Sequence, residues 1–176
     1  ADCSRSRAAA PAAGILRFER KGWRDVSRTE RYGIVAVGAG AMKDRPRILL
    51  IGPTALDSRG QPIKQRRLHL PGLTLPMLAA VTPRDCEVRL VSETVDDIPF
   101  DEHWDLVGIT GMGSGIVRAW QIADAFRARG TVVAIGGIAA SLGEPDWTLQ
   151  HADVLVTGEA EETWPQVVAD FAAGRL

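Results

Sequence analysis

Hydrophobic and polar positions alternate in a regular order from Arg47 to the end of the chain. Short continuous apolar runs are typical of strands buried on both faces of a sheet, whereas apolar residues spaced three and four apart predict helices. The runs predict five strands, at residues 47–52, 86–91, 105–110, 131–135 and 154–157. The helical spacing predicts helices at residues 73–81 and 114–129 and from residue 161 onward, with a short helix or turn at 95–103.

The helical stretches at 114–129 and from residue 161 onward each place their large apolar residues on one face. Such a stripe packs against a sheet, and Gly130 and Gly174 stand where glycine ends a helix. Strands that alternate with helices form a parallel sheet with right-handed crossovers. The sequence therefore predicts an α/β fold of the flavodoxin-like (Rossmann-like) type, with a five-stranded parallel sheet in the order 2-1-3-4-5 and helices on both faces.

Glycines follow three of the predicted strands directly. Gly111 follows the third strand, Gly136 and Gly137 follow the fourth, and Gly158 follows the fifth. All three breaks lie at the carboxyl edge of the sheet, where open α/β sheets bind ligands. Glycine lets a ligand approach the backbone closely, and Thr110 and Ser114 add hydroxyl groups. A tight turn is the alternative reason for the tandem glycines.

The 176 residues, 45% of them hydrophobic, suffice for one domain with its own core. Residues 1–44 have little apolar periodicity, and we expect them to be a disordered leader before a domain at residues 45–176. Up to residue 41 the chain carries eight Lys or Arg against four Asp or Glu. Met42 is our hypothesis for the natural start, and a basic organelle-targeting leader is the alternative.

Charge, cysteine content and hydropathy exclude several classes of protein. The mildly acidic remainder of the chain argues against a nucleic-acid surface. Cys3 and Cys86 are far apart and form no CxxC motif, so we expect neither disulfides nor a metal cluster and predict a reducing, cytoplasmic setting. No apolar run approaches the ~20 residues that span a bilayer.

Three common ligands of such a sheet edge are excluded because the residues that they require are missing from the loops. A phospho-receiver domain needs an acidic residue after the third strand, where this chain has Thr110. A flavin phosphate site needs a loop rich in Ser, Thr and Gly after the first strand, whereas Pro53 removes a backbone donor there. The dinucleotide fingerprint GxGxxG is incomplete, because Ile116 stands where the motif that begins at Gly111 requires its third glycine. We find no nucleophile–base pair either.

Five segments of the chain together form a pattern that is typical of one known protein family. The strongest are the tandem glycine of Ala134-Ile-Gly-Gly and the segment Gly158-Glu-Ala-Glu-Glu-Thr-Trp-Pro. The others are Leu70-Pro-Gly-Leu-Thr-Leu-Pro-Met-Leu-Ala-Ala, Asp105-Leu-Val-Gly-Ile-Thr and Arg118-Ala-Trp-Gln-Ile-Ala-Asp-Ala-Phe-Arg-Ala-Arg-Gly. In this order and at this spacing, residues 47–176 resemble the cobalamin-binding domain that precedes the catalytic barrel in B12-dependent radical SAM proteins.

The resemblance implies that the nucleotide tail of cobalamin enters between the strand ends, with the corrin ring over that edge. Residues of all the edge loops then become candidate cofactor contacts. They are Pro53, Thr54, Thr110, Gly111, Met112, Ser114, Gly136, Gly137, Gly158 and Glu159. Glu161 and Glu162 are better explained by the dipole of the last helix, and Trp164 by core or domain-interface packing.

Two departures from the family pattern bear on chemistry. Where many B12 domains carry the cobalt-ligating His of DxHxxG, alignment on Asp57 puts Arg59, so we predict no lower His ligand from this loop; His69 is a weak substitute. The CxxxCxxC motif for the [4Fe–4S] cluster is absent. We therefore expect a fragment that binds cobalamin, whose intact form adds a radical SAM barrel with its cluster and S-adenosylmethionine. The alternative is a non-catalytic Rossmann-like interaction module without cobalamin.

Overall fold

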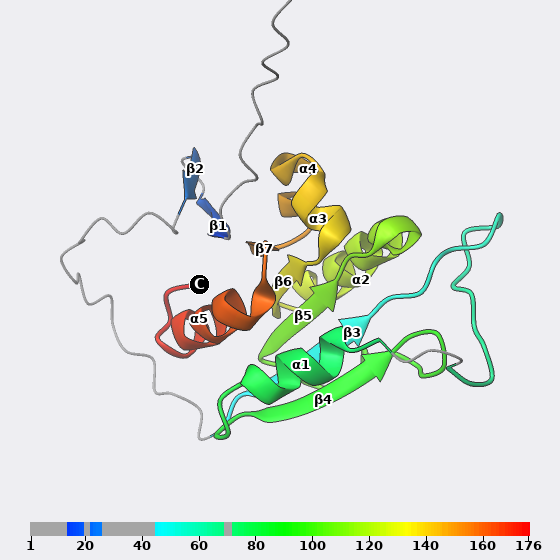
Figure 1. Cartoon of the computed structure of the whole chain (residues 1–176), viewed down its shortest axis with the longest axis horizontal. Coiled ribbons are helices and arrows are strands. Elements are labelled where there is room, and N and C mark those ends of the chain that lie inside the picture. Colours follow the sequence, from blue (N-terminus) through cyan, green and yellow to red (C-terminus); the bar gives the residue numbers. More distant parts are fainter. Residues whose placement is uncertain (1–13, 20–21, 26–44, 69–71) are drawn as a thin grey trace, which may run out of the picture.

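The computed structural model describes residues 14–19, 22–25, 45–68 and 72–176 (Figure 1). The strands are β1 (Gly14–Glu19), β2 (Gly22–Asp25), β3 (Arg47–Gly52), β4 (Glu87–Ser92), β5 (Leu106–Thr110), β6 (Val132–Gly136) and β7 (Val154–Thr157). The helices are α1 (Thr74–Val81), α2 (Ile116–Arg127), α3 (Ile138–Leu142), α4 (Pro145–Leu149) and α5 (Ala160–Ala172), with a 3₁₀ turn, η1 (Gly113–Gly115), before α2.

The sheet has the strand order β2-β1-β7-β6-β5-β3-β4. From β4 to β7 every pair is parallel. Numbered along the chain, these five strands have the order 2-1-3-4-5, so the predicted flavodoxin-like fold is confirmed. Because all five strands are parallel, their carboxyl ends lie at one edge of the sheet.

Two antiparallel strands extend the sheet beyond β7. β1 pairs with β7, and β2 pairs with β1. The apolar pattern did not predict them, and they lie within residues 1–44, for which we expected a leader. The division of the chain at residue 45 stays a prediction, and Met42 lies outside the described residues.

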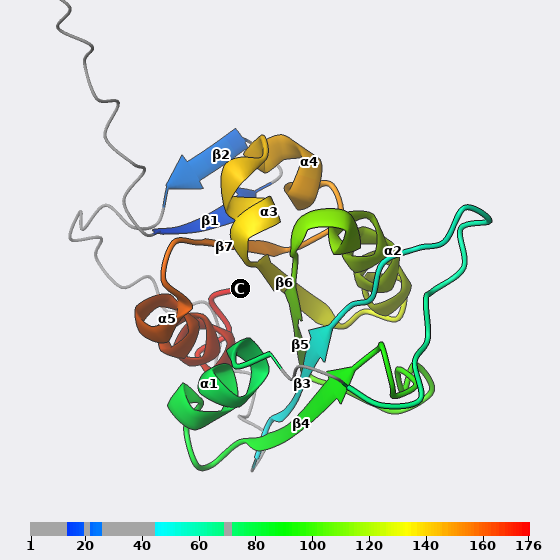
Figure 2. The same ribbon diagram turned by 45° about the vertical axis from the view of Figure 1, so that its right-hand side comes forward.

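Helices cover both faces of the sheet (Figure 2). α1 and α5 lie on one face, where the buried cluster includes Leu78, Trp164 and Val167. α2, α3 and α4 cover the opposite face, where the cluster includes Trp104 and Phe126. We call these the α1/α5 face and the α2 face.

The predicted helices form with small shifts at their ends, and two short helices were missed. α2 begins at Ile116 rather than Ser114 because η1 occupies the three preceding residues. α3 and α4 have five residues each, too few for a three- or four-residue period to be recognised. Among the described residues, no helix is both long and apolar enough to cross a membrane.

Candidate functional site

The two faces of the sheet differ in side-chain size because large and small residues alternate along β5 and β6. On the α2 face, neighbouring strands place Ile51, Ile109, Ile135 and Leu155 in one row. On the α1/α5 face the register pairs Gly108 with Ala134 and Thr110 with Gly136. We call Gly108 and Ala134 the small row. Because these residues have little or no side chain, they leave space between the sheet and the helices above it.

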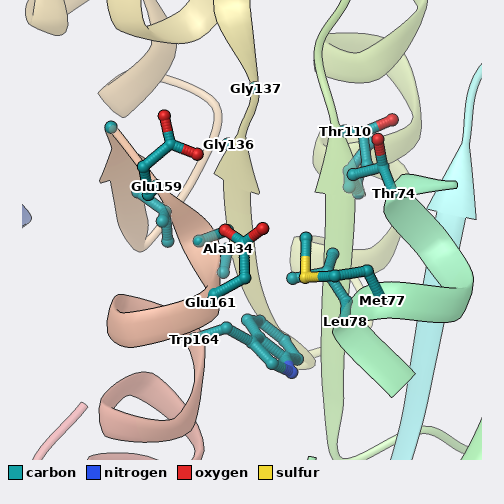
Figure 3. Close-up of a pocket in the computed structure, with 15 residues that line it drawn as sticks. Thr74, Met77, Leu78, Thr110, Ala134, Gly136, Gly137, Glu159, Glu161 and Trp164 are labelled. Carbon is teal, nitrogen blue, oxygen red and sulfur yellow. The ribbon is translucent and has the colours of Figure 1, made fainter. Parts of the chain in front are cut away.

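A cavity of about 260 Å³ occupies this space (Figure 3). α1 forms one wall with Met77 and Leu78, and α5 forms the other with Glu161 and Trp164. The remaining lining residues come from the strand ends and the first residues of both helices: Thr74, Gly108, Ile109, Thr110, Ala134, Gly136, Gly137, Val156, Gly158, Glu159 and Ala160. The cavity thus lies at the carboxyl half of the sheet, where the glycine breaks predicted a ligand site.

Trp164 closes the cavity at its buried end. Its indole N–H donates to the Thr82 hydroxyl at 2.9 Å, and that hydroxyl donates to the Leu78 carbonyl at 2.7 Å. A Cβ at Gly108 would lie 2.9 Å from the Trp164 ring and 2.8 Å from Leu50, closer than atoms pack in protein interiors. Glycine at residue 108 therefore makes room for the ring, which is held in one orientation by its hydrogen bond.

The cavity is apolar at one end and polar at the other. Leu78, Ala134, Val156 and Trp164 are all buried, with at most 7% of their surface exposed. Thr74, Glu159 and Glu161 are exposed and Thr110 is half-buried. Figure 3 shows Trp164 at one end, Thr110, Thr74 and Glu159 at the other, and Glu161 between them.

The charged side chains of the cavity are both carboxylates. Glu159 precedes α5 and Glu161 lies in its first turn, where negative charge interacts favourably with the helix dipole. Among the described residues, no Lys or Arg lines the cavity. Its open end therefore suits hydroxyl and amide donors better than an anionic group.

Gly137 is required by backbone geometry. Its φ is +99°, and a Cβ there would lie 2.7 Å from the Gly111 carbonyl oxygen. The loops after β5 and β6 also bond to each other, because the Gly111 N–H donates to the Gly136 carbonyl at 2.6 Å. A close contact between two loops thus accounts for Gly137, so the tandem glycines serve the turn as well as the cavity.

Of the ten predicted site residues, half line the cavity: Thr110, Gly136, Gly137, Gly158 and Glu159. The others lie nearby in the edge loops: Pro53, Thr54, Gly111, Met112 and Ser114. Met112 is 68% exposed and Ser114 is exposed, while Gly111 is buried beneath the loop contact. The structure thus brings half of the predicted set into one cavity and leaves the other half around it.

Thr54 has structural partners for both of its polar groups. Its N–H donates to Glu93 at 3.1 Å and its hydroxyl donates to the Ile63 carbonyl at 2.7 Å. Glu93 is 2% exposed and also accepts two hydrogen bonds from Arg118 of α2, at 2.9 and 2.6 Å. This ion pair anchors the beginning of the β3–α1 segment to the α2 face, away from the cavity.

Residues 53–68, which follow β3, extend away from the sheet as an arm (Figure 1). Its tip is a turn in which one carboxylate oxygen of Asp57 accepts from the N–H groups of Arg59 and Gln61, each at 2.8 Å. Neither Asp57 nor Arg59 lines the cavity. His69 lies outside the described residues.

His103 and His151 precede β5 and β7 at the opposite edge of the sheet. His103 contacts Asp105 at 2.9 Å, and His151 contacts Asp124 at 2.9 Å. Each histidine thus has a carboxylate partner, which supports the structural role expected for both. In the described part of the chain, no group of three or more His, Cys, Asp or Glu is arranged to hold a metal ion.

Sequence reasoning missed most of the apolar lining. Trp164 was assigned to packing, and it is indeed buried, yet it also closes the cavity. Met77, Leu78 and Glu161 were placed on helices without regard to the space between them. The signal that could have found them is the small row, Gly108 and Ala134. Small residues in two neighbouring strands predict an unfilled space between the sheet and the helices that cover it.

Comparison with known proteins gives two related curated sequences, while no family model matches. The chain is 39% identical to bacteriochlorophyllide d C-8(2)-methyltransferase of Chlorobaculum tepidum over 105 residues, which are 59% of this chain and 23% of the relative. It is 29% identical to bacteriochlorophyllide d C-12(1)-methyltransferase of the same organism over 140 residues, which are 78% of this chain and 30% of the relative. The similarity thus spans between about a quarter and a third of each methyltransferase.

One solved structure is similar, a β-glucosidase from Listeria innocua in complex with isofagomine. The TM-score is 0.44 at 14% identity, over 93% of this chain and 24% of that one. This likeness carries no argument about function.

Proposed function

We propose that residues 45–176 form the cobalamin-binding domain of a B12-dependent radical SAM methyltransferase. The observation that carries the proposal is the cavity at the carboxyl edge, built by the small row and walled by α1 and α5. The resemblance described above puts the nucleotide tail of cobalamin at this edge. The sequence similarity to two enzymes named as methyltransferases supports methyl transfer as the reaction of the whole protein.

The size and lining of the cavity fit one part of cobalamin rather than the whole molecule. Its volume of about 260 Å³ lies just below the ~300–1,000 Å³ of typical small-molecule sites. It therefore suits a single flat ring system, such as the base of the nucleotide tail. Leu78, Met77 and Trp164 would hold that base, while Thr110 and Glu159 would accept hydrogen bonds from donors at the open end.

When bound, cobalamin would carry the methyl group that is transferred. The chain's own residues would hold and orient it. Trp164 is fixed by Thr82, and the loops after β5 and β6 are fixed to each other at Gly111 and Gly136. Such pre-organised walls reduce the ordering cost of binding. A radical SAM barrel with its [4Fe–4S] cluster belongs to the proposal for the whole protein, since this chain matches about a quarter to a third of its relatives.

Reconstitution with hydroxocobalamin followed by desalting tests the proposal. We expect the protein to retain the corrin absorbance in a ratio near one per chain. Thr110→Tyr, which places a ring in the open end of the cavity, should abolish retention. Thr131→Tyr is the matched control, because Thr131 is also half-buried but stands at the opposite edge of the sheet.

The alternative is a non-catalytic interaction module that binds no cobalamin. A colourless wild-type protein after desalting would favour this alternative and overturn the proposal. If the Thr110→Tyr and Thr131→Tyr proteins retained equal corrin absorbance, the cofactor would bind outside the cavity.

A further inference from the structure

We infer that the cavity selects among cobamides by the polarity of their lower base, favouring bases with a carbon-only outer ring over adenine. This inference rests on the proposed function and concerns the same cavity. The observation that carries it is the difference between the two ends of the cavity. The buried end is formed by Leu78, Gly108, Ala134, Val156 and Trp164.

No free hydrogen-bonding side chain reaches the buried end from the described residues. The indole N–H of Trp164 is engaged by Thr82, and the Thr82 hydroxyl donates to Leu78. The backbone groups of Gly108 and Ala134 lie between paired strands. A ligand atom at this end therefore meets carbon and the Met77 sulfur, a weak acceptor.

Lower bases differ in the edge that would point into the cavity. The six-membered ring of dimethylbenzimidazole carries only C–H and methyl groups, whereas that of adenine carries two ring nitrogens and an amino group. Both bases carry the imidazole nitrogen, so it contributes equally to the two binding free energies. Buried without partners, the additional polar atoms of adenine weaken binding, because each leaves its hydrogen bonds to water unreplaced.

Glu161 is the polar side chain that could offer adenine a hydrogen bond and so reduce the difference in affinity. It lies between the two ends in Figure 3, and its carboxylate can accept a hydrogen bond from an amino group. It cannot donate to the ring nitrogens of adenine when ionised. Those two acceptors stay unpaired, so the discrimination persists with Glu161 in place.

Equilibrium dialysis against three cobamides tests the inference. Cobalamin and adeninylcobamide differ in polarity and size, whereas benzimidazolylcobamide has a base of the size of adenine with the carbon edge of dimethylbenzimidazole. We expect benzimidazolylcobamide to bind within a few-fold of cobalamin, and adeninylcobamide to bind about 10- to 100-fold more weakly. Quenching of tryptophan fluorescence gives an independent reading of the same affinities.

A substitution in the wall sharpens the test. Met77→Gln keeps the length of the side chain and brings an amide donor and acceptor to the cavity, so it should narrow the gap between adeninylcobamide and cobalamin. Leu142→Gln is the control, since Leu142 is 82% exposed and lies outside the cavity; it should leave the gap unchanged.

The outcomes separate this inference from the function on which it rests. Equal affinity for all three cobamides overturns the inference and leaves cobalamin binding intact. The inference is also overturned if benzimidazolylcobamide binds as weakly as adeninylcobamide, because the size of the lower base rather than its polarity would then determine the affinity. Failure of all three to bind overturns the proposed function and the inference together.

Discussion

The two faces of the sheet are built from the same strands but differ in how completely they are filled. On the α2 face, the row of Ile51, Ile109, Ile135 and Leu155 packs in one buried cluster with large side chains of the covering helices, such as Ile122 and Phe126 of α2. On the α1/α5 face, the small residues Gly108 and Ala134 leave a cavity beneath α1 and α5.

The difference teaches that one alternating sequence can encode a core and a binding site at once. Successive strand residues point to opposite faces, so alternating large and small residues fill one face and leave the other open. Substitutions that add the same atoms to each face should therefore have different effects, and we consider them from the largest expected effect to the smallest.

The largest contrast is expected for Ala134→Leu and Ala123→Leu. Ala123 lies on α2 and is 0% exposed within the filled face, where overpacking costs about 1–3 kcal/mol of unfolding free energy. Ala134 is 2% exposed but lines the cavity, so leucine there fills space and should leave the unfolding free energy unchanged or raise it by about 0.5–2 kcal/mol. Urea unfolding of both variants measures the contrast. Equal destabilisation would contradict the distinction between the faces.

A smaller effect is expected where glycine makes room for Trp164. Gly108→Ala would place a methyl 2.9 Å from the ring and 2.8 Å from Leu50, and should lower the unfolding free energy by about 1 kcal/mol. Gly52→Ala is the control in a neighbouring strand, because its Cβ would lie an ordinary 3.5 Å from Leu75. Thermal denaturation monitored by tryptophan fluorescence compares them. A more stable Gly108→Ala variant would show that the indole has room to move.

The smallest effect concerns Cys86, which packs at the margin of the α1/α5 face. Burial, and secondarily the Asp85 carboxylate, raises the pKa of the Cys86 thiol. A raised pKa means less thiolate at a given pH, so alkylation by iodoacetamide should have its midpoint at higher pH in folded than in urea-denatured protein. The Cys3→Ser variant removes the other thiol from the measurement. Coincident midpoints would indicate that this margin of the face is open to solvent.

The sequence predicted the fold better than the site, for physical reasons. Continuous apolar runs are a strong signal for buried parallel strands, and the predicted ranges 47–52 and 154–157 agree with β3 and β7 at both ends. The five-residue helices α3 and α4 and the strands β1 and β2 carry no such period and were missed.

At the site, glycines and hydroxyls marked the correct edge but not the walls. Thr110 and Gly136 were predicted and line the cavity, because residues after strand ends are visible in the sequence. Met77 and Trp164 were missed as cavity residues, because their role depends on where α1 and α5 pack. Thr54 was predicted as a contact, yet Glu93 and Ile63, distant in sequence, engage its polar groups.

The affinity of the Ala134→Leu variant for cobalamin, compared with wild type by equilibrium dialysis, tests the central claim most directly. Leucine at residue 134 fills the floor of the cavity without disturbing the α2 face. We predict at least a tenfold loss of affinity, equivalent to about 1.4 kcal/mol, without a loss of stability toward urea. Unchanged affinity in a folded Ala134→Leu protein would contradict the claim that this cavity holds the cofactor.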